Sequence, residues 1–326
     1  MVGGNDMARA LWYAGPGRAE LREERLPPLA KDHVRVRALY GAISRGTEAL
    51  IASGRVPESE YRRMRAPFMA GDFPFPVKYG YSTVGRIEAG PDDLVGQIAF
   101  TLFPHQTLFD LPAAAAVVVP AGIPPSRAVL AANMETALNA TWDASPGPVG
   151  RIGVVGAGVV GALVGLLCAG IEDAEVTLVD IDPAREKLAR AFGLKFAVPN
   201  AAPKDCGFVF HASASAAGLA TALDMAADEA TILELSWYGA GTVAVPFGGA
   251  FHSRRLKLIS SQVGKVAPSR RASFSHRQRL EAAIKLLADK RIDVLLAPPV
   301  LFQDLPAKLP DILKPGSGVL CQLIQY

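Results

Sequence analysis

Three glycines and one aspartate stand at a spacing that suits the binding of a dinucleotide. Gly156, Gly158 and Gly161 follow the strand-like run RIGVV and open an apolar stretch with the character of a helix. Glycine there lets the backbone bend tightly and approach a diphosphate, which lies at the positively polarised N-terminus of the helix. Asp180 ends the next strand-like run, VTLVD, nineteen residues after Gly161 and close to the ~20 of this fingerprint. The predicted cofactor site comprises Gly156, Gly158, Val159, Val160, Gly161 and Asp180.

The acid at position 180 also predicts which dinucleotide binds. A carboxylate there can accept hydrogen bonds from the ribose 2′- and 3′-hydroxyls and would repel a 2′-phosphate. We therefore expect NAD as the cofactor rather than NADP. The alternative is that Asp180 only caps the helix that follows it.

The same apolar stretch could instead cross a membrane. Residues 152–171 carry no charge, and about 20 apolar residues span a bilayer as a helix. The stretch contains six glycines, however, and each glycine in a helix interior costs roughly 0.5–1 kcal/mol relative to alanine. No cluster of Lys or Arg flanks it as a topology signal would. The sequence thus predicts a strand, turn and helix that bind a cofactor, and no membrane contact.

The composition is that of a soluble protein with more than one hydrophobic core. The chain has 326 residues, of which 50% are hydrophobic and 20% charged, and such a length usually forms two domains. A formal net charge of +3 is too small to indicate a nucleic-acid partner. The three cysteines are scattered, which excludes a cysteine-rich zinc lobe and fits a reducing cytoplasm. Because the N-terminus lacks the pattern of a secretory signal, we expect a cytoplasmic location.

Two kinds of pattern divide the chain. Residues 32–44 alternate apolar and basic side chains, and 82–90 and 96–103 are short apolar runs bounded by turn residues, as in a small β-barrel. The proline-containing segment 57–76 has no periodicity and is predicted to be a long surface loop. From about residue 124, strand-like and helix-like segments alternate, which predicts a parallel sheet with helices on both faces.

Three helices in this second part have recognisable signals. Residues 125–144 show helical spacing. Asp182 can cap a helix that Gly193 ends. Residues 275–290 predict a further helix with one apolar stripe.

These features together resemble the medium-chain dehydrogenase/reductase superfamily, the alcohol dehydrogenase-like proteins, over nearly the full chain. The segments that carry the resemblance are GAISRGTE, YGYSTVGRI, GQIAF and VVGAGVVG followed by LVDIDPARE. The segment SRGTE is most similar to the corresponding segment of zinc-less relatives of the hydroxyethyl bacteriochlorophyllide dehydrogenase type. The resemblance implies an α/β protein with a GroES-like β-barrel over 1–122 and a Rossmann doubly wound parallel sheet over 123–265. Residues 266–326 would then return to the first domain.

Three positions depart from the zinc-dependent members of this family. Where those members bind the catalytic metal with Cys, His, and Cys or Glu, this chain has Ser44, Tyr81 and Ala132. Zinc in proteins prefers thiolate, imidazole or carboxylate ligands, so we predict that no zinc is bound. A protein group must then donate the proton and stabilise charge on the substrate oxygen.

The resemblance implies Tyr81, Ser44 and Glu48 as catalytic candidates. Tyr81 could donate to a developing alkoxide, and Ser44 could bond the substrate oxygen. Glu48 could orient a partner or act as a general base. The structural alternatives are barrel packing for Tyr81, turn formation for Ser44 and a first-turn helix acid for Glu48. Asn133 and Glu135 are the candidates for substrate contact.

Further cofactor contacts are implied by the same alignment. Arg45 matches a residue that binds the pyrophosphate in some relatives, Thr136 lies beside the nicotinamide, and Arg185 lies near the adenosine ribose. Ser213 follows a later parallel strand, at the sheet edge where ligands gather.

The resemblance implies no function for one basic turn. His252, Arg254 and Arg255 could meet an acidic substrate or a dimer partner, and the alternative is an exposed basic turn before a strand.

The sequence therefore predicts a zinc-independent, NAD(H)-dependent oxidoreductase that transfers hydride between nicotinamide and a carbonyl or secondary alcohol. Phe68, Phe73 and Phe75 in the loop 57–76 suggest an apolar or planar substrate. Two alternatives stay open: an enone or quinone reductase, and an NAD-binding protein without catalysis. By resemblance, the chain would form a homodimer or homotetramer.

Overall fold

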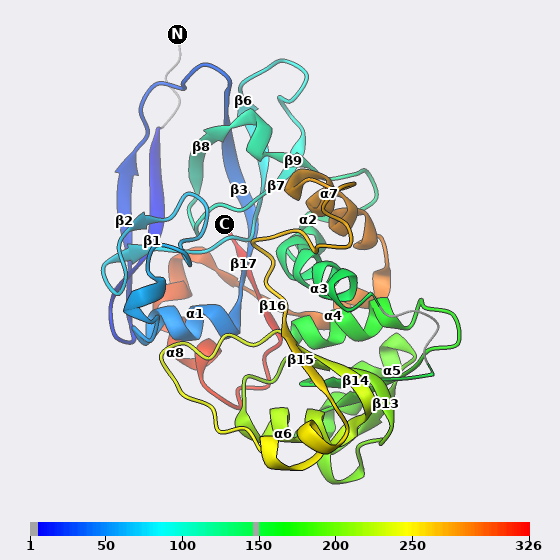
Figure 1. Ribbon diagram of the computed structural model, residues 1–326. Helices are drawn as coiled ribbons and strands as arrows, with labels where there is room; N and C mark the ends of the chain where they lie inside the picture. Colours follow the sequence, from blue (N-terminus) through cyan, green and yellow to red (C-terminus); the bar gives the residue numbers. More distant parts are fainter. Residues whose placement is uncertain (1–5, 146–149) are drawn as a thin grey trace. The chain divides into compact units, whose positions relative to one another are not determined.

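The computed structural model describes residues 6–145 and 150–326, so residues 1–5 of the predicted first domain lie outside the description (Figure 1). Contacts divide the chain into two units. Unit 1 comprises Met1–Ala132 and Leu296–Tyr326, and unit 2 comprises Asn133–Leu295. The observed boundaries lie later in the chain than the predicted ones at 122/123 and 265/266. Residues 266–295 belong to unit 2, and a helix within them is joined to Glu135 by an ion pair.

Unit 1 is built on two sheets. A seven-stranded sheet has the order β16-β17-β3-β6-β7-β9, with β8 also paired to β3, and a four-stranded sheet has the order β2-β1-β5-β4. Strands β3, β6 and β7 lie where the sequence predicts strands. The strands are β1 (Met7–Gly15), β2 (Arg18–Arg25), β3 (His33–Ile43), β4 (Ala70–Gly71), β5 (Val77–Lys78), β6 (Thr83–Ala89), β7 (Ile98–Thr101), β8 (Leu108–Pro112), β9 (Val117–Val118), β16 (Leu296–Leu301) and β17 (Cys321–Gln325).

The alternating pattern of β3 determines which of its faces is buried. Val34, Val36 and Ala38 are buried and pack with Phe103 and Phe109 in one core cluster. Full burial of a valine or phenylalanine side chain stabilises the fold by roughly 1.5–3 kcal/mol. The C-terminal strand β17 pairs antiparallel with the end of β3, so it lies beside the residues that lead into the following helix. The helices of this unit are α1 (Arg45–Ala52), α2 (Pro125–Ala128) and α8 (Leu305–Leu313).

Unit 2 contains a six-stranded sheet in which every neighbouring pair is parallel. Its order is β12-β11-β10-β13-β14-β15. The chain order reverses between β10 and β13, which is the doubly wound arrangement that the sequence predicts and the point where such sheets bind ligands. The strands are β10 (Arg151–Val155), β11 (Glu175–Val179), β12 (Lys195–Ala197), β13 (Cys206–His211), β14 (Ala226–Glu234) and β15 (Lys257–Ser260). The helices are α3 (Ala131–Ala144), which starts at the unit boundary, α4 (Val159–Cys168), α5 (Glu186–Phe192), α6 (Ala216–Met225) and α7 (His276–Leu286).

The predicted helix ends are found at the expected residues. The Asp182 carboxylate accepts a hydrogen bond from the amide of Ala184 and caps the 3₁₀ turn that leads into α5. Gly193 ends α5 with a φ of 72°, in the left-handed region that glycine adopts readily. Ser275 begins α7 with a capping box shared with Gln278.

Two expectations about apolar segments have clear outcomes. The helix predicted over 125–144 is interrupted between α2 and α3, where the amide of Leu130 bonds three residues back to Arg127. The stretch 152–171 forms strand β10 and the ten-residue helix α4. Within 6–145 and 150–326, no helix is long and apolar enough to cross a membrane.

Candidate functional site

The glycine turn between β10 and α4 has the geometry of a phosphate-binding turn. Gly156 has a φ of +103°, and a Cβ atom there would lie 2.7 Å from the amide nitrogen of Ser213. A Cβ atom on Gly161 would overlap the carbonyl oxygen of Gly156. A Cβ atom on Gly158 would meet no heavy atom within 4 Å, so this side of the turn is open. The first and third glycines thus allow the backbone to close, and the second leaves room for a ligand.

The helix that follows offers amide donors to that opening. Gly158 is the N-cap residue of α4, and no side chain caps the helix there. The amides of the first helical turn, including those of Val159 and Val160, have no carbonyl acceptor within the helix. Together with the helix dipole they favour an anionic group. The residues present therefore fit the diphosphate of a dinucleotide.

Asp180 lies against the same turn. Its Oδ2 accepts from the amide of Ala157 at 2.7 Å, and its Oδ1 accepts from the amide of Asp182 at 2.9 Å. The helix cap itself is Asp182, so capping alone does not account for Asp180. A carboxylate has about four acceptor positions, so Asp180 can still accept from a ribose. The basic residue predicted near that ribose, Arg185, lies 3.5 Å from the Asp182 carboxylate.

In unit 1, three hydroxyl groups meet at the start of α1. The phenol of Tyr81 donates to Ser44 Oγ at 2.5 Å and lies 3.3 Å from Thr47 Oγ1. Burial raises the pKa of Tyr81, and the hydrogen bonds with Ser44 and Thr47 only partly oppose this. The phenol therefore carries its proton at neutral pH. Thr47 was not predicted from the sequence, although a residue three positions after Ser44 on a helix shares its face.

The carboxyl group of Glu48 lies behind this cluster and supports it. Its Oε1 accepts from the amide of Ser44 at 2.8 Å. Its Oε2 accepts from the Tyr13 phenol at 2.6 Å and lies 3.0 Å from Nε2 of His105. Glu48 and His105 are both buried, with exposed fractions of 1% and 0%. Of the two functions predicted for Glu48, orientation of a partner matches this geometry.

The side chains at the three positions that the resemblance aligns with metal ligands do not fit a catalytic zinc ion. Ser44 and Tyr81 are neutral hydroxyl groups that bond to each other, and Ala132 carries no donor in its side chain. Zinc sites of the catalytic kind use three ligands drawn from thiolate, imidazole and carboxylate.

Arg45 bonds to the C-terminal segment of its own unit. Its guanidinium donates to the carbonyl oxygens of Ile312, Lys314 and Val319, with distances of 2.8 Å to Ile312 and 3.0 Å to Lys314. These contacts join α1 to the segment after α8. The predicted contact of Arg45 with a pyrophosphate stays a prediction that would compete with these bonds.

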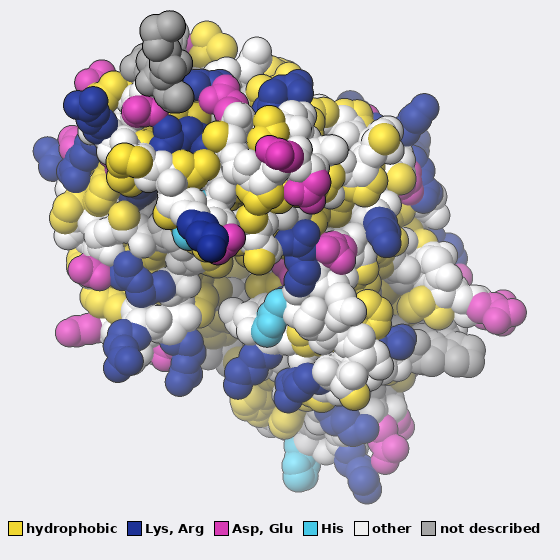
Figure 2. Space-filling model, turned by 90° about the horizontal axis from the view of Figure 1, so that it is seen from above, with side chains coloured by type: hydrophobic (Ala, Val, Ile, Leu, Met, Phe, Trp, Pro, Cys, Tyr) yellow, Lys and Arg dark blue, Asp and Glu magenta, His cyan; other side chains and the backbone are white. Residues whose placement is uncertain are grey.

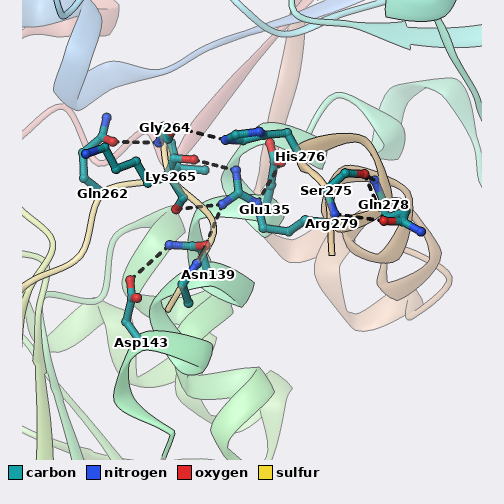
Figure 3. Close-up of polar contacts among 12 residues, drawn as sticks. Glu135, Asn139, Asp143, Gln262, Gly264, Lys265, Ser275, His276, Gln278 and Arg279 are labelled. Atoms are coloured by element: carbon teal, nitrogen blue, oxygen red, sulfur yellow. Dashed lines mark hydrogen bonds and ion pairs between the residues drawn. The ribbon is translucent and has the colours of Figure 1, made fainter. Parts of the chain in front are cut away.

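Glu135 forms a buried ion pair, shown in Figure 3. Arg279 on α7 donates to Glu135 Oε1 at 3.0 Å and to Asn139 Oδ1 at 2.6 Å. Burial raises the pKa of Glu135, and the Arg279 charge opposes that effect. The pair explains the position of Glu135 without a substrate. Asn133 and Thr136, half-buried on the same helix, keep their predicted functions untested.

Ser213 belongs to a hydrogen-bonded group at the carboxyl ends of β13 and β14. Its Oγ lies 2.7 Å from Nε2 of His211, and the Glu234 carboxylate lies 2.7 Å from Nδ1 of the same ring. His211 was not among the site residues predicted from the sequence. His211 and Glu234 are 23 residues apart on neighbouring strands, so only the pairing of β13 with β14 brings them together.

The basic turn before β15 is paired with acids of its own unit. Arg255 lies 3.3 Å from Glu229, and Arg254 lies 3.9 Å from Asp228. These contacts match the alternative of an exposed, solvated turn. Figure 2 shows Lys and Arg interspersed with Asp and Glu on the face that it presents.

The loop 57–76 contributes aromatic side chains to unit 1. Phe73 is buried, and Phe68 is 37% exposed and stacks on Phe103 with ring centroids 5.3 Å apart. The predicted function of these rings in substrate binding remains a prediction.

Several solved structures have the same fold as this chain. L-idonate 5-dehydrogenase from Escherichia coli matches with a TM-score of 0.79 and 13% identity over 98% of both chains. A short chain alcohol dehydrogenase from Escherichia coli CFT073, solved with NADH, matches with 0.78 and 14% over 99% of this chain and 100% of the other. A putative zinc-binding dehydrogenase from Sinorhizobium meliloti, bound to NADP, matches with 0.77 and 16% over 98% of this chain and 99% of the other. No protein-family model matches the sequence, and no curated protein sequence does. At these identities the likeness establishes a shared fold.

Proposed function

The chain has the fold of the medium-chain, alcohol dehydrogenase-like proteins, and we propose that it is an oxidoreductase of that type. The proposed reaction is hydride transfer between NAD(H) and a carbonyl or secondary alcohol carbon, without zinc. The observation that carries the proposal is the open glycine turn at the N-terminus of α4, with the Asp180 carboxylate beside it.

The residues of unit 2 would hold the cofactor. The amides of Val159 and Val160 would donate to the diphosphate, and Gly158 would leave space for it. Asp180 would accept from the adenosine ribose and exclude a 2′-phosphate, which supports NAD over NADP. The NADH and NADP found in two structures of this fold support a nicotinamide cofactor in general.

The bound nicotinamide would supply or accept the hydride. In the direction of reduction, Tyr81 would donate its proton to the substrate oxygen as negative charge develops there. Ser44 Oγ, 2.5 Å from the phenol oxygen, can then rotate its hydrogen toward the phenolate and stabilise it. General acid catalysis of this kind contributes on the order of 10²–10⁴-fold in rate.

Glu48 would be a positioning residue in this reaction. Its two oxygens are occupied by the Ser44 amide, the Tyr13 phenol and the His105 ring. It therefore fixes the first residue of the hydroxyl cluster and does not itself reach a substrate proton.

The test begins with binding. NADH and NADPH are titrated by protein fluorescence or calorimetry on protein whose zinc content has been measured. We expect tight NADH binding, weak NADPH binding and zinc far below one ion per chain.

NAD-linked turnover is then screened with secondary alcohols and ketones, and with enones and quinones in parallel. A preference for NADPH with turnover of enones would favour a C=C reductase, and binding without any turnover would favour a non-catalytic NAD-binding protein.

The function of Tyr81 is tested with Tyr81→Phe, which removes only the hydroxyl group. We expect kcat to fall by about 10²–10⁴-fold while the Kd of NADH stays within about twofold. Tyr40→Phe is the matched control, because Tyr40 is a half-buried tyrosine on β3 of the same unit. Equal kcat values for Tyr81→Phe and the unmodified protein would remove Tyr81 from the mechanism.

Two expectations about the whole protein accompany the proposal. The three cysteines are free and buried, which supports a reducing compartment such as the cytoplasm. The homodimer or homotetramer implied by the resemblance can be measured by light scattering coupled to size exclusion.

A further inference from the structure

The carboxyl ends of β13 and β14 carry a chain of hydrogen bonds beside the phosphate-binding turn, and its central group, the His211 ring, is buried. The Glu234 carboxylate contacts His211 Nδ1 at 2.7 Å, and His211 Nε2 contacts Ser213 Oγ at 2.7 Å. Ser213 Oγ lies 3.0 Å from the hydroxyl of Ser215, which is exposed. The imidazole ring itself has no exposed surface. A buried ionisable ring is thus connected to the surface through two hydroxyl groups.

At the Glu234 end of this chain of hydrogen bonds, the carboxylate accepts two further hydrogen bonds. Glu234 accepts from the amide of Ser236 at 2.8 Å and from the phenol of Tyr238 at 2.9 Å. Burial alone would raise the pKa of Glu234, but the hydrogen bonds with His211 and Ser236 outweigh it, and the pKa is lowered. The group is therefore ionised at neutral pH and only accepts, so His211 Nδ1 must carry a hydrogen.

Glu234 aside, the neighbours that the structure records for the imidazole within residues 6–145 and 150–326 are uncharged. Its neighbour on β10 is Val155, and its neighbour on α6 is Gly218. The Tyr238 ring stacks on it from the chain after β14, and burial raises the pKa of that phenol, which stays protonated. Among the described residues, Glu234 and Tyr238 are the titratable groups that contact His211.

The backbone of Ser213 lies against the cofactor turn, and its hydroxyl lies against α6. A Cβ atom on Gly156 would come within 2.7 Å of the Ser213 amide nitrogen, and a Cβ atom on Gly218 would overlap Ser213 Oγ. Ser213 is therefore held between the turn and α6. The next residue, Ala214, has a φ of 52°, a left-handed conformation that costs energy for alanine and is common at functional sites.

We propose that Glu234, His211 and Ser213 couple dinucleotide binding at the Gly156 turn to the uptake of one proton by His211. The proposal rests on the cofactor site described above. It makes His211 a positioning residue, which acts on the ligand through Ser213.

The hydrogen-bond donors and acceptors of each group determine which protonation state of His211 favours binding. In the neutral ring, Nε2 accepts, so the Ser213 hydroxyl hydrogen points inward. In the protonated ring, Nε2 donates to Ser213 Oγ, and the hydroxyl hydrogen turns outward to the Ser215 side. A hydroxyl donor and a nearby positive charge both favour an anionic diphosphate. Binding should therefore be tighter when His211 is protonated.

The test measures proton linkage with ADP-ribose, which contains the diphosphate and lacks the nicotinamide, and with NADH. Calorimetric titrations are run at four pH values from 5.5 to 8.5, in two buffers that differ in ionisation enthalpy. We expect the Kd of ADP-ribose to rise with pH by up to about tenfold per unit, the limit for one linked proton, with proton uptake visible in the buffer dependence. His211→Gln should abolish this dependence.

Two further variants separate a positioning function from a structural one. Ser213→Ala keeps the ring and its carboxylate, removes the hydroxyl that joins the ring to Ser215, and should also flatten the pH profile. It preserves the test if His211→Gln fails to fold. His252→Gln, an exposed histidine of the same unit, is the matched control and should retain the full dependence.

The outcomes distinguish this inference from the proposed function. An unchanged pH dependence in His211→Gln or Ser213→Ala would overturn the coupling and leave the cofactor site intact. A flat profile in the unmodified protein would do the same. If neither ADP-ribose nor NADH bound at any pH, the cofactor site itself would be wrong, and the coupling with it.

Discussion

Removal of the Arg279 guanidinium should destabilise unit 2 strongly, because it would leave a buried carboxylate without its counter-ion. Arg279 is 2% exposed and Glu135 is 6% exposed. The guanidinium also donates to the carbonyl oxygens of Val263 at 2.5 Å and Lys265 at 3.1 Å (Figure 3). Arg279→Met would therefore leave four acceptors without this donor, Asn139 included.

The size of the effect can be worked out from the burial of the pair. Loss of one partner of a buried ion pair costs about 3–5 kcal/mol, because the remaining charge stays desolvated. For a domain of the size of unit 2, each kcal/mol lowers Tm by roughly 2–4 °C, which gives a decrease of about 6–20 °C. Replacement of both partners, in Arg279→Met with Glu135→Leu, should recover most of this loss, since no charge is then buried.

The assay is urea and thermal unfolding of the single and double variants across pH. The matched control is Arg277→Met on the same helix, whose more exposed pair with Glu281 should contribute about 0–1 kcal/mol. Burial raises the pKa of Glu135, and without Arg279 only the smaller effect of His276 opposes it. A carboxyl group with a raised folded-state pKa contributes stability that is present at low pH and is lost as the pH rises through that pKa. The loss in Arg279→Met should therefore be largest near neutrality and shrink toward pH 4.

A pH-independent loss, with the double variant as unstable as the single one, would refute this reasoning. The Arg279–Glu135 contact would then not be an ion pair that stabilises unit 2. Glu135 would be available again for the substrate contact that its alignment implies.

Two predictions concern the cofactor turn. Gly158→Ala and Gly161→Ala should both weaken NADH binding by more than about tenfold, but only Gly161→Ala should lower Tm, because its Cβ atom overlaps the Gly156 carbonyl whereas that on Gly158 meets open space. Equal Tm losses in unfolding experiments would contradict this geometry. Asp180→Asn keeps an acceptor for the Ala157 amide and removes the charge, so fluorescence titration should show the preference for NADH over NADPH reduced by about tenfold or more. An unchanged ratio would mean that Asp180 does not select the cofactor.

The features that the sequence predicted correctly depend on short-range interactions. The Asp182 cap, the left-handed Gly193 and the turn from Gly156 to Gly161 are each determined within a few residues of chain. Helix caps and glycine turns carry the same signals in any fold, so a single sequence is enough to find them.

The features that it could not predict depend on strand pairing and helix packing. His105 is 57 residues from Glu48, and Arg279 is 144 residues from Glu135. Such partners meet only when register and packing are known, because many other pairings of His, Arg and acids would satisfy the same composition. The assignment of α7 to the unit that contains Glu135 depends on the same kind of long-range packing.

The contacts that hold Tyr81 and Ser44 in place help to decide whether these residues form a working site. Burial of Glu48 carries a desolvation cost, which its bonds to the Ser44 amide, the Tyr13 phenol and His105 offset. Apolar residues of similar volume would pack the same space without that cost. Stability alone therefore gives no reason for a buried acid at this position. A fixed position for the Ser44 hydroxyl beside a protonated phenol does give one, because proton donation to a developing alkoxide requires donors that are held in place before the reaction begins.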